Sequence, residues 1–254
     1  MGMAEILRFD YPLPQDERIH AIWDQISAVR HDVYADELHQ YDPNSVGKIE
    51  DPGRHFIACV EGDDLAGYIS LNPPGSKPFR LTTYFSGEAL DRTVFAMCED
   101  PETSTFEVRG LTVASAHRGR NLAFRLMRYA LEFVIERGGV DIVAMGHSNV
   151  VKLYENNGMK VFHDESVTHG ETVYFPMHMN VVATATAFAE KIKADVEEEH
   201  GDEACYHGGQ SWEASKFDFD VRDSLIVADV LDSPFPPCPE ALTVIREHLE
   251  RCCQ

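Results

Sequence analysis

The residues with the clearest chemical meaning lie in the segment 106–127. An apolar pattern with a period of two predicts a strand in its first half, and apolar residues at three- and four-residue steps predict a helix in its second half. Arg118, Gly119 and Arg120 stand between the two. The first N–H groups of a helix have no partner within the helix and lie at the positive end of its dipole, and a glycine beside them lets the backbone curl around an anion. The segment therefore predicts a binding site for a pyrophosphate.

The sequence around this loop resembles a known family. It has neither the Gly-Lys-Ser/Thr ending of a P-loop nor the GxGxxG of a dinucleotide-binding fold. His117–Ala123 resembles instead the acyl-CoA-binding motif of the GNAT acyltransferase superfamily, Arg/Gln-x-x-Gly-x-Gly/Ala. Asn121 replaces a frequent second glycine, and asparagine tolerates unusual backbone angles. Asn149–Met159 resembles a second GNAT motif, N-x-x-A-x-x-L-Y-x-x-x-G-F, and the resemblance covers roughly residues 15–180.

The GNAT resemblance implies an N-acyltransferase that uses acetyl-CoA or another acyl-CoA as co-substrate. In such enzymes the amine of a small molecule or amino acid attacks the thioester directly, so the amine must lose a proton and the thiolate must gain one. The residues that the resemblance assigns to acyl-CoA binding are Leu111, Val113, Arg118, Gly119, Arg120, Asn121, Leu122, Ala123 and Asn149.

Two residues are candidates for these proton transfers. Glu107 lies on the predicted strand just before the place where the acyl group and the amine meet, and we expect it to be the general base; the alternative is that it pairs with Arg109 or with a neighbouring strand. Tyr154 matches the family tyrosine near the thioester sulfur and is the candidate general acid; the alternative is a tyrosine packed on the sheet. His147 either lines the site or is structural.

A weaker resemblance concerns the region upstream. Arg30–Leu38, followed by Tyr41 and Asp42, is similar to the first part of autoinducer synthases and N-acyl amino acid synthases, a GNAT-like branch. The strand 107–113 matches their E-x-x-R-x-x-V pattern loosely. This resemblance implies, as an alternative function, an acyl-homoserine-lactone or N-acyl amino acid synthase whose donor is acyl carrier protein. The simpler explanation is the first helix of any GNAT domain.

Carrier protein is acidic, so its docking requires a local basic patch, which the sequence can supply from Arg118, Arg120, Arg125 and Arg128.

A function from a different class is also open: a non-catalytic domain that binds acyl-CoA as a sensor or serves only for docking.

The surrounding pattern predicts the elements that position these residues. Helices are predicted at 17–38, 121–137 and 150–156, and strands at 55–60, 65–71, 105–113, 140–145, 159–162 and 172–179. The turn residues between the first two strands make them a hairpin, and residues 76–103 match no clear pattern. With the resemblance, this order predicts an α/β fold of GNAT type, with a mixed, mostly antiparallel sheet, helices on both faces and a C-terminal extension.

Composition and charge exclude several function classes. With 22 Lys+Arg against 43 Asp+Glu, the net charge is −21, and such a field repels nucleic-acid phosphates. No apolar run approaches the roughly 18–20 residues that cross a bilayer, and the charged start has no signal-peptide core. We therefore expect a cytoplasmic protein. The six cysteines form no CxxC pair and the histidines no HxH or HExxH, so we expect reduced thiols and no structural metal.

The end of the chain carries a separate prediction. We expect an acyltransferase domain at 1–180, a helix and acidic linker at 181–203, and an incomplete second domain at 204–254. Tyr206–Glu213 and Asp229–Ala241 resemble the opening of histidinol-phosphate aminotransferase-like PLP enzymes, but their lysine-bearing domain is absent, so no PLP is expected in this chain alone. The tail is then the leading arm of a fused enzyme; alternatively, it folds back or exchanges with a second copy in a homodimer.

Overall fold

The computed structural model describes residues 4–39, 53–76, 78–119, 121–185 and 187. These residues divide into two compact units. The first contains the described residues up to 131 together with 141–180, and the second contains 132–140 and the described residues from 181 onward. The predicted acidic run and aminotransferase-like arm lie outside the described residues.

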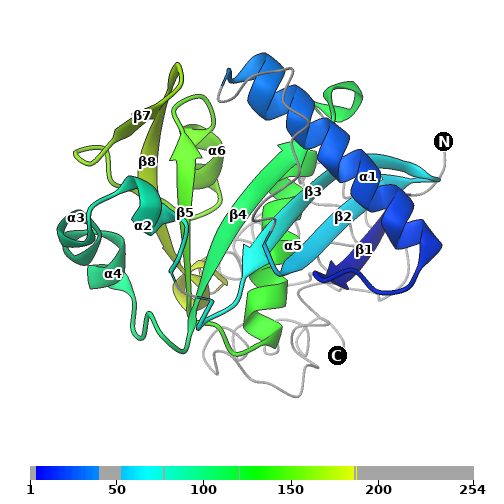
Figure 1. Ribbon diagram of the computed structural model, residues 1–254. Helices are drawn as coiled ribbons and strands as arrows, with labels where there is room; N and C mark the ends of the chain where they lie inside the picture. The colour runs from blue at the N-terminus through cyan, green and yellow to red at the C-terminus, as the bar shows by residue number, and fades with distance from the viewer. Residues whose placement is uncertain (1–3, 40–52, 77, 120, 186, 188–254) are drawn as a thin grey trace, which may run out of the picture. The chain divides into compact units, whose positions relative to one another are not determined.

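One sheet forms the framework of the first unit (Figure 1). Its strands, within the described residues, are β1 (Ala4–Asp10), β2 (His55–Glu61), β3 (Asp64–Asn72), β4 (Thr105–Val113), β5 (Asp141–His147), β6 (Lys160–Val161), β7 (Val167–His169) and β8 (Thr172–Asn180). The order across the sheet is β1-β2-β3-β4-β5-β8-β6, and β7 pairs with β8. Neighbouring strands are antiparallel except β4 and β5, which are parallel.

The helices differ in length and type. They are α1 (Glu17–His31), the π-helix η1 (Asp32–Glu37), α2 (Leu81–Tyr84), α3 (Gly87–Arg92), α4 (Val94–Met97), the 3₁₀-helix η2 (Ser115–His117), α5 (Leu122–Glu136) and α6 (Val151–Asn156). Asp16 caps α1, because its carboxylate accepts the backbone N–H groups of Arg18 and Ile19 at 2.9 and 3.2 Å. A bilayer-spanning helix is not found among the described residues.

α1 and the start of α5 cover opposite faces of the sheet. The apolar face of α1 packs with Phe56 and Tyr68 of β2 and β3. Gly67 precedes Tyr68 on β3, so it faces the other side of the pleated strand. A Cβ on Gly67 would lie 3.3 Å from Cδ2 of Leu122, in the first turn of α5. Helices therefore lie on both faces, as the sequence predicts.

β4 and β5 separate after three paired positions. Their last parallel pair is Glu107 with Val143, and Figure 1 shows the two strands diverging beyond it. β4 also contains a bulge against β3, since a register shift leaves Arg109 as the additional residue. A bulge bends its strand and redirects the side chains next to it. β4 therefore bends next to the point at which it separates from β5.

The predicted fold class is confirmed: the sheet is mixed and mostly antiparallel, with helices on both faces. The predicted hairpin, the strand at 105–113 and the helices at 121–137 and 150–156 are present with bounds that differ by at most two residues. The predicted helix at 17–38 is α-helical only to His31, and its end is π-helical. The segment 76–103, which matched no pattern, contains α2, α3 and α4.

The sequence did not predict β1, because charged residues interrupt its apolar alternation. The structure explains one of them, because Glu5 accepts hydrogen bonds from the guanidinium of Arg18 at 2.6 and 3.2 Å at the exposed edge of the sheet. β7 was also not predicted, since a three-residue strand carries too little pattern to recognise.

Candidate active site

A cavity of about 460 Å³, here called the large cavity, occupies the space where β4 and β5 have separated. Strand residues beyond the last β4–β5 pair line it, among them Val108 on β4 and Met145 on β5. The π-helix η1, the loop before α5, the helix α6 and Tyr174 of β8 also contribute to the lining. Backbone N–H and C=O groups that face no neighbouring strand remain available to a ligand. The large cavity therefore suits an extended ligand inserted between the two strands.

The predicted pyrophosphate loop has the curled backbone that its motif requires. Gly119 and Asn121 have φ angles of +78° and +55°, in the left-handed region. Glycine adopts such angles freely, and asparagine is one of the few other residues that does so readily. Arg120 lies outside the described residues. Asn121 thus takes the conformation for which relatives of the motif frequently use a second glycine.

Arg118 is held by an acidic residue from a distant segment. Its Nη1 and Nη2 donate to the two carboxylate oxygens of Glu37 at 3.0 and 2.8 Å, and its Nε donates to the carbonyl of Val113 at 3.2 Å. The hydrogen bonds and charge of Glu37 raise the pKa of Arg118. Both side chains line the large cavity and are nearly half exposed, at 45% and 42%. A phosphate that binds Arg118 must therefore compete with Glu37.

Some of the residues assigned to acyl-CoA binding line the large cavity and others do not. Leu122 is buried against β3, so only its backbone can contact a ligand. Gly119 and Asn121 are exposed on the loop and do not line the large cavity. The assigned residues that do line the large cavity are Leu111, Val113, Arg118, Ala123 and Asn149.

Tyr154 and His147 both line the large cavity. Gly146 allows Tyr154 to pack closely on β5, because a Cβ there would lie 3.2 Å from Cδ2 of the tyrosine and 2.5 Å from Cε of Met177. Burial raises the pKa of Tyr154, and the nearby phenols of Tyr34 and Tyr174 add to the effect. Burial lowers the pKa of His147, and its buried Nδ1 has no hydrogen-bond partner among the described residues. Tyr154 thus keeps its proton, while His147 is neutral.

Glu107 is buried, with 1% of its surface exposed, and both carboxylate oxygens accept hydrogen bonds. The backbone N–H of Leu81 donates to Oε1 at 2.9 Å, and the amide of Asn72 on β3 donates to Oε2 at 3.2 Å. Nε of Arg109 lies 3.7 Å from Oε2. Burial raises the pKa of Glu107, against the lowering effect of Arg109 and of these hydrogen bonds. Glu107 therefore makes the contacts to Arg109 and to a neighbouring strand that a structural role would require, and it also lines a second cavity.

That second cavity, here called the small cavity, has a volume of about 120 Å³. It adjoins the large cavity, with which it shares lining residues such as Tyr34 and Arg109. Its described lining contains three arginines, Arg30, Arg80 and Arg109, and one carboxylate, that of Glu107. The large and small cavities are therefore adjacent, and arginines predominate among the charged residues that line the small one.

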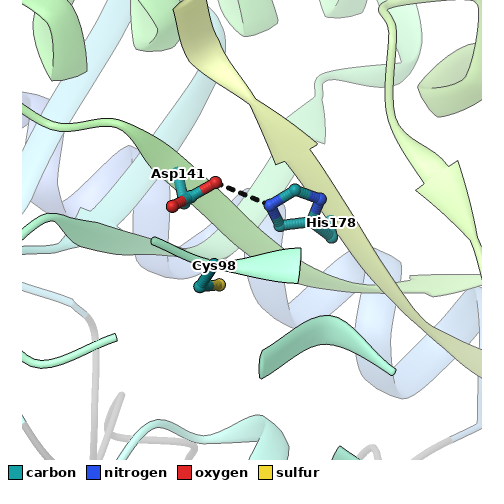
Figure 2. Close-up of side chains that lie close together, drawn as sticks. All are labelled: Cys98, Asp141 and His178. Atoms are coloured by element: carbon teal, nitrogen blue, oxygen red, sulfur yellow. Dashed lines mark hydrogen bonds and ion pairs between the residues drawn. The ribbon is translucent and has the colours of Figure 1, made fainter. Parts of the chain in front are cut away.

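A different cluster of polar side chains lies at the start of β5 (Figure 2). The backbone N–H of Glu99 and Nε2 of His178 donate to the two oxygens of Asp141 at 2.8 and 2.7 Å. Cys98 completes the cluster, and burial together with the charge of Asp141 raises the pKa of its thiol to about 11. Cysteine, aspartate and histidine are ligand types that zinc uses. Here both oxygens of Asp141 already accept hydrogen bonds from protein donors. The cluster therefore links β5 to β8 and to the segment after α4.

Several site residues were not identified from the sequence because they come from distant segments. Glu37 is on η1, Arg80 and Tyr84 are at α2, and Tyr174 is on β8. The stretch beginning at Arg30 was noted only through the weaker resemblance. One signal was available: in a chain with 22 basic and 43 acidic residues, arginines near candidate strands stand out.

Comparison with known proteins identifies a family relationship. The sequence model of the acetyltransferase (GNAT) family matches residues 16–159. No curated protein matches the sequence.

Solved structures show the same fold at low identity. A CoA-dependent acyl-homoserine lactone synthase, BjaI, with SAM and isopentyl-CoA, has a TM-score of 0.54 and 16% identity over 88% of this chain and 100% of that chain. The acyl-homoserine lactone synthase LasI has a TM-score of 0.52 and 12% identity over 71% and 91%. An acyl-CoA N-acyltransferase from Pseudomonas aeruginosa has a TM-score of 0.50 and 14% identity over 70% and 99%.

Proposed function

The chain belongs to the acetyltransferase (GNAT) family and is an acyltransferase, and on this premise we propose that it transfers an acyl group, acetyl in the simplest case, from acyl-CoA to the amine of a small molecule or an amino acid. The observation that carries the proposal is the separation of β4 and β5 after Glu107 and Val143, which opens the large cavity beside a curled loop. A pantetheine arm can pair with the separated strands while its pyrophosphate lies at the start of α5. The structurally similar synthase BjaI, solved with isopentyl-CoA, supports an acyl-CoA donor.

In this proposal the loop and the separated strands hold the donor. Arg118 donates charge-assisted hydrogen bonds to phosphate after leaving Glu37, and the backbone at Gly119 and Asn121 curls around the same group. Leu111 and Val113 line the arm, and Asn149 contacts it from the loop before α6. The acyl group then lies near the bulge of β4, where the large and small cavities meet.

The proton transfers are assigned to residues on either side of that meeting point. An acceptor ammonium and a thioester give an amide, a thiol and one free proton. Glu107 takes the proton that leaves the ammonium and passes it to solvent, the nitrogen forms its bond to the carbonyl carbon, and the carbon–sulfur bond breaks. Tyr154, which burial keeps protonated, donates to the leaving thiolate and then regains the second proton lost by the nitrogen.

Two alternatives share the same cavities. In the first, the donor is acyl carrier protein, docked on arginines at the start of α5, and the enzyme is an N-acyl amino acid or acyl-homoserine-lactone synthase; the solved synthases of similar fold are consistent with it. In the second, the domain binds acyl-CoA without turnover, as a sensor or docking module.

One experiment separates the three. The purified chain is incubated with acetyl-CoA, longer acyl-CoA thioesters or acyl carrier protein thioesters, each with a panel of amines and amino acids. Thiol release and product mass are measured, and binding of CoA is measured by calorimetry. Turnover with acyl-CoA supports the proposal. Turnover with carrier-protein thioesters alone supports the synthase, and binding of acyl-CoA without turnover across the panel supports the sensor.

A further inference from the structure

The small cavity concentrates positive charge in a strongly acidic chain. Its described lining supplies three guanidinium groups and a single carboxylate, whereas the chain as a whole has a net charge of −21. The long-range field of such a chain repels anions and attracts cations. The group of arginines that lines the small cavity therefore favours anions, in contrast to the chain as a whole.

Arg80 and Arg109 are held in place by contacts that also involve Glu107. The backbone N–H of Leu81 donates to Glu107 at 2.9 Å, and this fixes the start of α2, and with it Arg80, beside the strand. Nη2 of Arg80 donates to the hydroxyl of Tyr84 at 3.0 Å, and its guanidinium lies 5.5 Å from the centre of that ring. Arg109 is the bulged residue of β4, with 6% of its side chain exposed and its Nε 3.7 Å from Glu107.

Charges of both signs thus lie side by side where the acceptor must enter. Glu107 is suited to an ammonium group, and the guanidinium groups of Arg80 and Arg109 are suited to a planar anion that accepts two parallel hydrogen bonds. An α-amino acid presents these two groups on one carbon. A polyamine or another multiply cationic amine would instead place positive charge against the arginines.

We propose that the small cavity recognises a carboxylate on the acceptor, so that the substrates acylated by this enzyme are α-amino acids. Of the two arginines, Arg80 is the better one to mutate as a specificity-determining residue, because it is only partly buried. Replacing the nearly buried Arg109 would put folding at risk. The inference rests on the proposed function, since it names the acceptor of that same transfer.

The test compares acceptors that differ only in the anionic group. Each of the common amino acids is assayed beside its carboxamide with a saturating acyl-CoA, and thiol release gives kcat/KM. We expect the acids to exceed their amides by about tenfold or more, the size of an interaction between charged hydrogen-bonding groups. Ethanolamine and its phosphate ester are a further pair; selection of the phosphate ester without selection of the amino acids would contradict the carboxylate assignment.

The variant Arg80→Gln removes the charge, and Arg80→Lys keeps it without the bidentate geometry. We expect Arg80→Gln to lower kcat/KM for the preferred acids by about tenfold to a hundredfold, with little change for the amides, and Arg80→Lys to restore part of the selectivity. Acyl-CoA affinity should be unchanged in both variants. Arg92→Gln is the matched control, because Arg92 pairs with Glu88 and Glu165 on the exposed surface.

The outcomes distinguish this inference from the proposed function. Amides or polyamines acylated as fast as amino acids by the unmodified enzyme, or equal losses on acids and amides in Arg80→Gln, would overturn the inference and leave the acyltransferase activity standing. Absence of thiol release with every acceptor would instead overturn the proposed function. In that event, calorimetric binding of amino acids in the presence of CoA, lost in Arg80→Gln, still tests the small cavity directly.

Discussion

At its first residues β5 is paired with β4 on one side and β8 on the other, whereas among the described strands its last residues pair with β8 alone. At the first end, Asp141 is buried and both its oxygens accept hydrogen bonds from protein donors. At the other end, the buried Nδ1 of His147 lacks a partner among the described residues, and the strand borders the large cavity. The paired end of β5 thus holds the fold together, whereas its other end borders the candidate site.

Glu107 stands at the boundary between these two ends, and its replacement should have the largest effect. We expect Glu107→Gln to lower turnover by about 10²–10⁴-fold with little change in acyl-CoA affinity, because a positioned base contributes that much and the amide cannot take the proton. Steady-state kinetics and calorimetry check this. The loss should shrink at high pH, where the amine is already neutral. A fully active variant would make Glu107 purely structural.

The same residue gives a pH dependence whose sign follows from its burial. The pKa of Glu107 is raised above its ordinary value of 4.5. As the pH is lowered, Glu107 therefore becomes protonated, and turnover is lost, at a higher pH than for an enzyme whose base is an exposed glutamate. The folded state also keeps this proton to a higher pH than the unfolded state does. The free energy of unfolding therefore falls as pH rises from the ordinary value through the raised one. Glu107→Gln should lack both changes, in rate profiles and in urea titrations.

The paired end of β5 is tested by Asp141→Ala, which should affect stability rather than binding. The change leaves the buried Nε2–H of His178 and the backbone N–H of Glu99 without their acceptor. We expect a loss of about 3 kcal/mol in the free energy of unfolding, measured by urea denaturation. Asp91→Ala, on the exposed surface of α3, is the control. A loss no larger than that of the control would show that the buried pair does not stabilise the fold.

At the open end, Arg118→Ala should weaken acyl-CoA binding by about 1.5 kcal/mol, roughly tenfold, because it removes charge-assisted hydrogen bonds to phosphate. The lower end of the usual range is expected since Arg118 is nearly half exposed. Calorimetry at two salt concentrations measures the change, and the unmodified protein should show the stronger salt dependence. Unchanged affinity would remove Arg118 from the pyrophosphate site.

The smallest effect is expected from Glu37→Gln. This change releases Arg118 from its acidic partner without removing the arginine, so acyl-CoA affinity should rise, by at most about fivefold for so exposed an ion pair. The increase should vanish when Arg118 is already alanine. A decrease in affinity would mean that Glu37 orients Arg118 for the phosphate rather than competing with it.

The sequence alone was sufficient for elements and motifs whose residues are neighbours in the chain. The hairpin, the strand before the loop and the helix after it follow from periodicity, and Gly119 and Asn121 follow from the backbone angles that a curled loop requires. These features depend on interactions over a few residues, which the order of residue types expresses directly. The predicted fold class rested on the order of these elements together with the GNAT resemblance.

Only the tertiary structure decided which partners those residues meet. Glu37 reaches Arg118 across 81 positions, Leu81 donates to Glu107 across 26, and His178 donates to Asp141 across 37. No local pattern encodes such contacts, because they arise when the sheet brings distant segments together. The cationic lining of the small cavity has the same origin: its arginines come from α1, the start of α2 and β4, and only the folded chain places them around one space.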